Sequence, residues 1–254
     1  EPLFQQTIRE AGLNPHLFEM ANIRDQCSWV HMHEKEKATE KAKDLVRMAV
    51  AKSTWLEPLK PIPLAVIQKA LVVGGGIAGM TAALAIADQG YQVYLVEKAD
   101  RLGGNAIKVD KSVFNHPVTP FINELVGKVE AHDKIEVFTR SHLSFVEGFI
   151  GNYKTKIATQ DGAKERETEI EHGVSILATG ATESKPSEYF YGESDNVKTL
   201  LELNEEIVKP DFDIPDTVAF IQCVGSREPD HPYCSRICCG GAIRNAVRMK
   251  KEKP

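Results

Sequence analysis

Four of the five cysteines crowd into one short stretch of the chain and offer thiolate chemistry. They follow the pattern C-x10-C-x3-C-C, at Cys223, Cys234, Cys238 and Cys239. Thiolates ligate iron–sulfur clusters, and four of them match the ligand number of one [4Fe–4S] cube. The residue type and the spacing therefore predict an iron–sulfur site.

Two other chemistries are open to the same cysteines. Structural zinc sites favour C-x2–4-C pairs at each end, which the adjacent Cys238 and Cys239 fit poorly. A disulfide-redox pair would be expected as C-x-x-C, which this stretch lacks. Arg227, Arg236 and the amides of Gly240–Gly241 would stabilise thiolates and an anionic cluster. These features favour iron–sulfur chemistry and leave zinc and free or redox-active thiols as alternatives.

A second chemistry is predicted earlier in the chain, where the sequence ALVVGGGIAG opens a βαβ unit. The apolar run Ala70–Val73 predicts a buried parallel strand. An Ala-rich helix is predicted over Met80–Gln89, closed by Gly90 as its C-cap. A second strand, Gln92–Val96, then ends on Glu97. This order of elements is typical of dinucleotide binding.

Three glycines and one acid have separate physical roles in this unit. Gly74 permits a tight turn, Gly76 leaves room for a pyrophosphate, and Gly79 allows the helix to pack closely. The helix N-terminus presents unpaired N–H groups and a partial positive charge to the phosphates. Glu97 is placed to accept hydrogen bonds from ribose hydroxyls and to repel a 2′-phosphate, which disfavours NADP.

Two later motifs favour FAD as the dinucleotide. The Gly-Gly pair after the second strand resembles the extended fingerprint of two-dinucleotide-binding flavoproteins, in which this loop wraps over the FAD pyrophosphate and a basic residue contacts it. The run Val174–Gly180 predicts a buried strand ending in Ala-Thr-Gly, which in those flavoproteins approaches the flavin side of the cofactor. Each motif alone could be a plain turn or strand end. The predicted cofactor-binding residues are Gly74, Gly76, Ala78, Gly79, Glu97, Lys98, Arg101, Gly103, Gly104, Asn105, Leu143, Ala178, Thr179 and Gly180.

The composition excludes several classes of function. The 254 residues are 42% hydrophobic and 26% charged, which is ordinary for a folded domain. A net charge of −5 gives no basic field for nucleic acid. No apolar run approaches the roughly 20 residues that span a bilayer. No signal peptide is recognisable and the first residue is Glu1, so we expect part of a longer protein.

Three segments are predicted along the chain. Residues 1–60 form a helical, polar segment, residues 66–208 an FAD-binding domain, and residues 216–254 the start of a second Rossmann-like domain that carries the cysteines. The predicted fold class is α/β: a Rossmann-like two-dinucleotide-binding flavoprotein domain with a small antiparallel meander, preceded by a helical N-terminal segment. Within it we expect a charged helix near 34–56, a Pro-rich connector at 59–63, a helix at 117–132, a meander over 135–170, a strand at 216–224 and a helix at 242–250.

Cys27 stands apart from the other cysteines, and its surroundings allow two interpretations. With His31 and His33 it could ligate a metal. It could also be a half-buried thiol beside Trp29, with both histidines at the start of a helix. The local residues alone favour the second interpretation.

Together these motifs resemble one protein family. The stretches ANIRDQCSWVH, GGGIAGMTAALAIADQGYQVYLVEK, LGGNA, ILATGA and FIQCVGSR…YCSRICCGGAIRNA are similar to the A subunits of heterodisulfide reductases. The likeness extends over essentially the whole chain, and the CSWVH and CVGSR…YCSRICC stretches are specific. Related subunits of sulfate reducers share the layout.

The resemblance implies a cytoplasmic, anaerobic iron–sulfur flavoprotein with a thioredoxin-reductase-like core. Such a protein would hold FAD, and a [4Fe–4S] cluster on the four clustered cysteines. Residues 1–60 would then be the C-terminal part of an N-terminal iron–sulfur domain plus a long linker helix, and Cys27 would belong to a second cluster there, whose other ligands lie outside this chain. The ferredoxin-like cluster motifs of the family and the end of its FAD domain have no counterpart here.

The resemblance also implies flavin-based electron bifurcation, as in methanogenesis. Electrons would enter from a hydrogenase or formate dehydrogenase and leave toward heterodisulfide and ferredoxin, within a heterodisulfide reductase complex that contains a homodimer of this protein. Neither nucleic acid nor a membrane span is expected. One alternative is a stand-alone FAD-dependent pyridine nucleotide-disulfide reductase, which needs a second nucleotide fingerprint and a redox pair. The other is a non-enzymatic zinc-binding interaction module.

Overall fold

The chain divides after Leu64 in the computed structural model, which describes residues 2–60 and 62–254. The first unit is Glu1–Leu64 and the second is Ala65–Pro254. Pro61, in the predicted connector, lies outside the described residues. Within the described part of the chain, none of the helices has both the length and the apolar character needed to cross a membrane.

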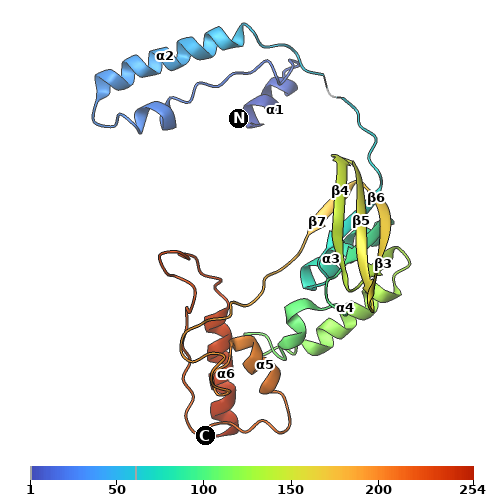
Figure 1. Ribbon diagram of the computed structural model, residues 1–254. Coiled ribbons are helices and arrows are strands. Elements are labelled where there is room, and N and C mark those ends of the chain that lie inside the picture. The colour runs from blue at the N-terminus through green and yellow to red at the C-terminus, as the bar shows by residue number, and fades with distance from the viewer. Residues whose placement is uncertain (1, 61) are drawn as a thin grey trace. The chain divides into compact units, whose positions relative to one another are not determined.

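The first unit is helical, and its longest helix exposes most of its charged residues. Its elements are α1 (Pro2–Glu10), the π-helical turn η1 (Arg24–Ser28) and α2 (Lys35–Ser53) (Figure 1). The charged helix predicted near residues 34–56 is α2. Ala42 and Leu45 on one side of α2 are half-buried, whereas Arg47 and Asp44 form an exposed ion pair along the helix at 2.7 Å.

Four parallel strands form the centre of the second unit. Their spatial order is β3 (Ile135–Phe138), β2 (Gln92–Val96), β1 (Lys69–Val73) and β7 (Val174–Leu177). The chain passes from β1 through β2 to β3 on one side, and later places β7 on the other side of β1. The carboxyl end of β1 is therefore a topological switch point, where open α/β sheets bind ligands.

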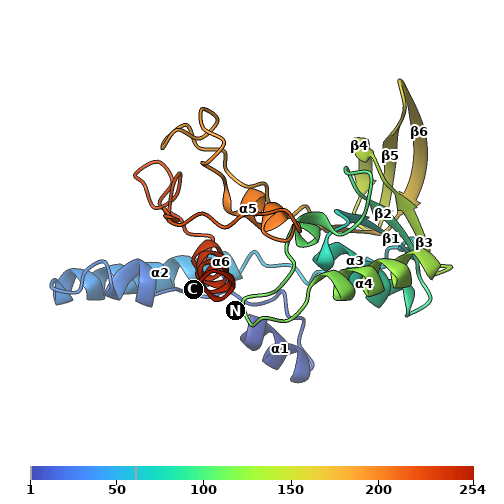
Figure 2. The same cartoon turned by 90° about the horizontal axis from the view of Figure 1, so that it is seen from below.

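The second unit has three layers: helices α3 (Ile77–Ala87) and α4 (Thr119–Ala131), the parallel sheet, and an antiparallel sheet (Figure 2). Val72 and Leu95 belong to one buried cluster, which includes residues of α3 and α4. Leu71 and Tyr94 point to the opposite face and join a second cluster that contains residues of an antiparallel sheet. The parallel sheet is thus covered by helices on one face and by the meander on the other.

The meander contains three strands, and one predicted strand of it belongs elsewhere. Its strands are β4 (Ser141–Phe149), β5 (Asn152–Asp161) and β6 (Lys164–His172), in antiparallel register. The run at 135–138 was predicted as part of this meander, but it pairs in parallel with β2 as β3. The reason is that α4 is a crossover helix, which returns the chain in the same direction as β2.

The strand before the Ala-Thr-Gly motif is less buried than predicted. Leu177, at its end, is 76% exposed. Among the described residues β7 pairs with β1 on one edge and with no strand on the other. An edge strand keeps part of its surface in water, and this position accounts for the difference.

The C-terminal region contains two helices and long loops. The helices are α5 (Leu200–Glu206) and α6 (Cys238–Glu252). The strand predicted at 216–224 is absent from this described region, because no neighbouring strand lies there to accept its hydrogen bonds. The helix predicted at 242–250 begins earlier, at Cys238, so that the last two clustered cysteines lie in its first turn.

The start of α5 is held by a capping box and an ionic network. Thr199 Oγ1 accepts a hydrogen bond from the Glu202 amide at 3.3 Å, and Glu202 Oε2 accepts one from the Thr199 amide at 2.8 Å. Tyr191 donates its hydroxyl to Glu202 at 2.8 Å, and Lys185 pairs with the same carboxylate. Partial burial raises the pKa of Glu202, but the hydrogen bonds from Lys185, Thr199 and Tyr191 outweigh it and lower the pKa to about 2.

We expect the Glu202 network to stabilise the protein less in acid. The pKa of Glu202 is about 2 in the folded chain and 4.5 ordinarily, so its contribution is complete above about pH 4.5 and declines as the pH falls toward 2. Glu202→Gln can keep the capping box but loses the charge that pairs with Lys185, so it should lower the free energy of unfolding by up to about 1 kcal/mol at pH 7. Urea unfolding at a series of pH values should show this difference shrinking below pH 4.5.

Glu130→Gln on the exposed face of α4 is the matched control and should leave the unfolding free energy unchanged at every pH. Equal stability of Glu202→Gln and wild type at pH 7 would contradict the assignment.

Candidate functional site

The loop Gly74–Gly79, called here the nucleotide loop, is shaped by very close backbone contacts. A Cβ atom at Gly74 would lie 2.2 Å from the Ala178 carbonyl oxygen, and one at Gly79 would lie 1.8 Å from the Gly74 carbonyl oxygen. Gly74 also has a φ of +111°, a conformation that L side chains rarely adopt. A Cβ atom at Gly76, by contrast, would meet nothing within 4 Å. Two of the glycines thus build the turn, and the third leaves the open space that a phosphate group needs.

Glu97 supports the nucleotide loop from the end of β2. Its side chain is buried, with Oε2 accepting from the Gly75 amide at 2.6 Å and Oε1 from the Ala99 amide at 2.8 Å. A carboxylate has about four lone-pair sites, so these two bonds leave capacity for ribose hydroxyls. The residue predicted to bind the ribose therefore also holds the loop in its shape.

The loop after β2 folds back over the nucleotide loop. Gly103 donates its amide to the Gly75 carbonyl at 2.8 Å, and a Cβ atom at Gly104 would lie 3.1 Å from Gly76 Cα. Both residues have positive φ, and Gly104 begins the short 3-10 helix η2 (Gly104–Lys108). Asn105 then donates its side-chain amide to the Ala181 carbonyl at 2.7 Å, just beyond the Ala-Thr-Gly motif.

The structure brings most of the predicted dinucleotide residues to one edge of the sheet. The loops after β1, β2 and β7 meet there, and the predicted residues on these loops that remain exposed are Ala78, Lys98, Arg101, Asn105, Thr179 and Gly180. Leu143 lies on β4 and packs, half-buried, against the second hydrophobic cluster. Its predicted cofactor contact stays a prediction.

Gly75 is a residue of this site to which the sequence analysis gave no role. It is buried, and a Cβ atom there would lie 2.5 Å from Leu102 Cδ2 and 2.9 Å from Glu97 Oε2. The run of three consecutive glycines was the available signal, because the fingerprint itself requires only the outer two.

A short hairpin brings the four clustered cysteines into one neighbourhood. The chain turns back where Arg227 donates its amide to the Tyr233 carbonyl at 3.2 Å, and Cys234 follows directly. The pKa of the Cys239 thiol is raised, chiefly by the charge of Cys238 and also by those of Cys223 and Cys234. Cys223, Cys234 and Cys238 therefore all lie within electrostatic reach of Cys239.

The four clustered cysteines do not form a coordination shell in this structure. Across residues 2–60 and 62–254, no group of three or more His, Cys, Asp or Glu side chains is arranged so that it could hold a metal ion. All five cysteines are unpaired thiols in the described chain. Cys223 has a φ of +64°, so its backbone is strained at the point where the cysteine stretch begins. The cluster ligands predicted from the sequence therefore stay a prediction, which rests on the residue type and the spacing of these cysteines.

The surroundings of Cys27 match a buried thiol. The side chain is 1% exposed, and its Sγ donates to the Ala38 carbonyl at 2.9 Å. His31 Nδ1 instead lies 3.1 Å from Glu34 Oε2. In this conformation the thiol and the histidine have separate partners, and a cluster role of Cys27 remains a prediction.

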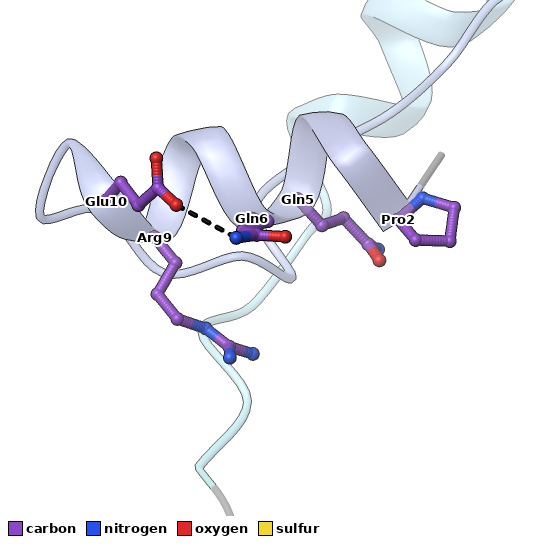
Figure 3. A pocket seen from close by; sticks show the side chains of 5 residues that line it. All are labelled: Pro2, Gln5, Gln6, Arg9 and Glu10. Atoms are coloured by element: carbon purple, nitrogen blue, oxygen red, sulfur yellow. Dashed lines mark hydrogen bonds between the residues drawn. The ribbon is translucent and has the colours of Figure 1, made fainter.

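A shallow pocket lies in the first unit and contains none of the predicted site residues. It lies along one side of α1 and is lined by Pro2, Gln5, Gln6, Arg9 and Glu10 (Figure 3). Gln6 donates to Glu10 across it at 3.0 Å. Polar side chains of a single exposed helix line it, so we assign it no function.

One protein-family model matches the part of the chain that contains the nucleotide loop. Residues 72–124 match the family described as NAD(P)-binding Rossmann-like domain. This range contains the nucleotide loop, α3, β2 and the loop that folds over it. The match agrees with the predicted Rossmann fold class.

Curated relatives match the chain over its full length. The A subunit of the H2:CoB-CoM heterodisulfide,ferredoxin reductase of Methanothermobacter thermautotrophicus is 36% identical over 344 aligned positions, covering 100% of this chain and 52% of the relative. A protein of Archaeoglobus profundus that is named for its likeness to the A subunit of heterodisulfide reductase is 38% identical over 272 positions, covering 100% of this chain and 37% of the relative. The chain thus spans about half the length of the relatives or less. This chain has 254 residues, whereas its alignment with the Methanothermobacter protein has 344 positions. The alignment therefore includes internal stretches of that relative that have no counterpart in this chain.

Among solved structures, the L-proline dehydrogenase of P. horikoshii superimposes with a TM-score of 0.40 and 26% identity, covering 51% of this chain and 26% of that one. The thioredoxin reductase of Lactococcus lactis superimposes with a TM-score of 0.38 and 25% identity. This match covers 49% of this chain and 40% of that one.

Two glycine substitutions should separate folding from nucleotide binding. Gly76→Val should leave the melting temperature nearly unchanged, because Gly76 has an ordinary φ of −77° and open space around it. It should weaken FAD binding at least about tenfold, or about 1.4 kcal/mol, by occupying the phosphate space. Calorimetric titration of FAD and NAD measures the effect.

Gly79→Ala is the counterpart and should lower the free energy of unfolding by roughly 1–3 kcal/mol, since its methyl group would collide with the Gly74 carbonyl. Tight FAD binding by Gly76→Val would show that the phosphates lie elsewhere.

Proposed function

Because this chain is homologous over its full length to the A subunits of heterodisulfide reductases, we propose that it is an electron-transfer segment of such an oxidoreductase, with FAD on the nucleotide loop and a [4Fe–4S] cluster on the clustered cysteines. One observation carries the proposal. A dinucleotide loop and four clustered, unpaired cysteines occur in the same unit of the chain.

The choice of FAD is supported by the loop after β2. Gly103 and Gly104 lie directly on the nucleotide loop, and Arg101 on the same loop is exposed beside them. The N-terminus of α3 and the amides around Gly76 would bind the pyrophosphate, and Glu97 would bind the ribose. Bound FAD would supply the conversion between two-electron and one-electron transfer. The residues of the chain bind the cofactor, orient it and exclude a 2′-phosphate.

The cluster is supported by the chemistry and the crowding of the cysteines. Cys238 and Cys239 lie at the N-terminus of α6, whose partial positive charge stabilises anionic sulfur. The Arg236 amide points to Cys234 Sγ at 3.4 Å, and such hydrogen bonds to sulfur tune cluster potentials. The amide of Gly241, expected to face the cluster, is instead bonded to the Ile237 carbonyl inside the helix at 3.2 Å. A bound cluster would carry single electrons.

The wider assignments rest on the resemblance. We propose three functional domains, at 1–60, 66–208 and 216–254, with Cys27 as one ligand of a further cluster shared with residues outside this chain. We also propose a cytoplasmic complex, built on a homodimer, that bifurcates electrons from a hydrogenase or formate dehydrogenase arm to heterodisulfide and ferredoxin.

Anaerobic reconstitution of the full chain with iron, sulfide and FAD tests the proposal. The wild type should bind about four irons and four sulfides, in addition to FAD. Cys238→Ala should lose most of this iron and keep FAD, because Cys238 is distant in sequence from the nucleotide loop and on a different element. Metal analysis and visible spectra measure both cofactors.

Ser226→Ala, a substitution in the same cysteine stretch at a residue that is not a proposed ligand, is the control and should retain the iron. Stoichiometric zinc in place of iron, or full iron content in Cys238→Ala, would overturn the cluster assignment.

A further inference from the structure

The segment Asp110–Val118, called here the linking segment, joins the dinucleotide site to the cysteine helix α6. It follows η2 and precedes α4. Its own ends are closed by a hydrogen bond from the Val118 amide to the Asp110 carbonyl at 2.8 Å, and the Ser112 amide donates to the His116 carbonyl at 2.8 Å. The linking segment is therefore a closed loop held at both ends by elements that carry or support the nucleotide loop.

Two arginines of α6 bind the linking segment across a long stretch of sequence. Arg248 donates to Asp110 Oδ2 at 2.7 Å, and both side chains are more than two-thirds buried, at 29% and 24% exposed. Arg244 donates to the Lys111 carbonyl oxygen. A Cβ atom at Gly240 would lie 3.0 Å from Val113 Cγ1, so the first turn of α6 also packs against this segment.

A buried polar network connects Arg244 of α6 to α5. Arg244 donates to Asn204 Oδ1 at 2.6 Å and to Asn245 Oδ1 at 2.9 Å, while Asn245 donates to Asn204 at 2.9 Å. Asn204 and Asn245 are only 4% and 1% exposed. Burying an amide is costly unless its hydrogen bonds are made, so this network favours the arrangement of α5, α6 and the linking segment that makes these bonds.

We propose that Arg248 and Arg244 are positioning residues that set the separation between the flavin and the cluster. This proposal rests on the proposed function. It names the residues that determine the distance between the flavin and the cluster. In the transfer, one electron leaves the reduced flavin and one enters the oxidised cluster, no covalent bond forms or breaks, and the proton released by the flavin passes to solvent. Electron-transfer rates fall steeply with distance, so loosening α6 slows the transfer without removing either cofactor.

Hydrogen–deuterium exchange on the cofactor-free full chain tests the positioning itself. Arg248→Gln should speed exchange in both the linking segment and the first turns of α6, and Asp110→Asn should do the same. Arg47→Gln is the matched control. It breaks an Arg–Asp pair of the same 2.7 Å length within α2, and should leave both regions unchanged.

Stopped-flow measurement of electron transfer tests the consequence. In the reconstituted chain, Arg248→Gln should slow transfer from the reduced flavin to the cluster by at least about tenfold, at unchanged FAD and iron content. The charge swap Asp110→Arg with Arg248→Asp should recover part of the rate. The transfer rate of Arg248→Lys should lie between those of the wild type and Arg248→Gln. The lysine ammonium keeps the positive charge but lacks the planar guanidinium, whose N–H groups donate in a fixed fork geometry.

Different results would overturn the positioning proposal and the proposed function. Unchanged exchange and an unchanged rate in Arg248→Gln, with both cofactors bound, would overturn the positioning proposal and leave the proposed function intact. A wild-type chain that binds neither FAD nor iron would overturn the proposed function, while the exchange experiment would still decide whether Arg248 holds α6.

Discussion

The close contact between Gly74 and the Ala178 carbonyl joins the first and last strands of the parallel sheet at their carboxyl ends. A side chain at Gly74 would separate them, since even a Cβ atom would lie 2.2 Å from that oxygen. Glu97 binds the next residue of the loop from β2. Three strand ends therefore meet within one hydrogen-bonded group of loops, and the dinucleotide residues predicted on those loops depend on it for their positions.

Two helix N-termini of the second unit are placed where negative charge is expected. α3 begins at Ile77 after the nucleotide loop, and α6 begins at Cys238 within the cysteine stretch. The first would face phosphates and the second thiolates, and the partial positive charge of a helix start stabilises both. At α6 the neighbouring thiols raise the pKa of Cys239, and the partial positive charge of the helix start opposes that effect.

The polar network around Arg244 has a structural cost that an apolar contact would not have. Desolvating a guanidinium lowers the pKa of Arg244, and two buried asparagines must keep every bond they make. Apolar side chains of similar volume often pack with equal or greater stability than buried ionic groups, so geometry is a better explanation of such a network than stability. The proposed separation between a flavin and a cluster would be one function that needs such geometry.

Local pattern was enough for the parts of this protein that depend on backbone conformation and periodicity. The strand Gln92–Val96, the glycine turn, the Ala-rich helix and the crowding of Cys223 to Cys239 could all be predicted, because residue type and spacing alone decide them. Only the tertiary structure decided which strands pair and which side chains distant in sequence come into contact. It placed residues 135–138 in the parallel sheet, left 216–224 without a strand, gave Gly75 its role beside Glu97, and joined Arg248 to Asp110 across 138 positions. Each of these depends on a partner distant in sequence, and no local pattern encodes which distant partner will be near.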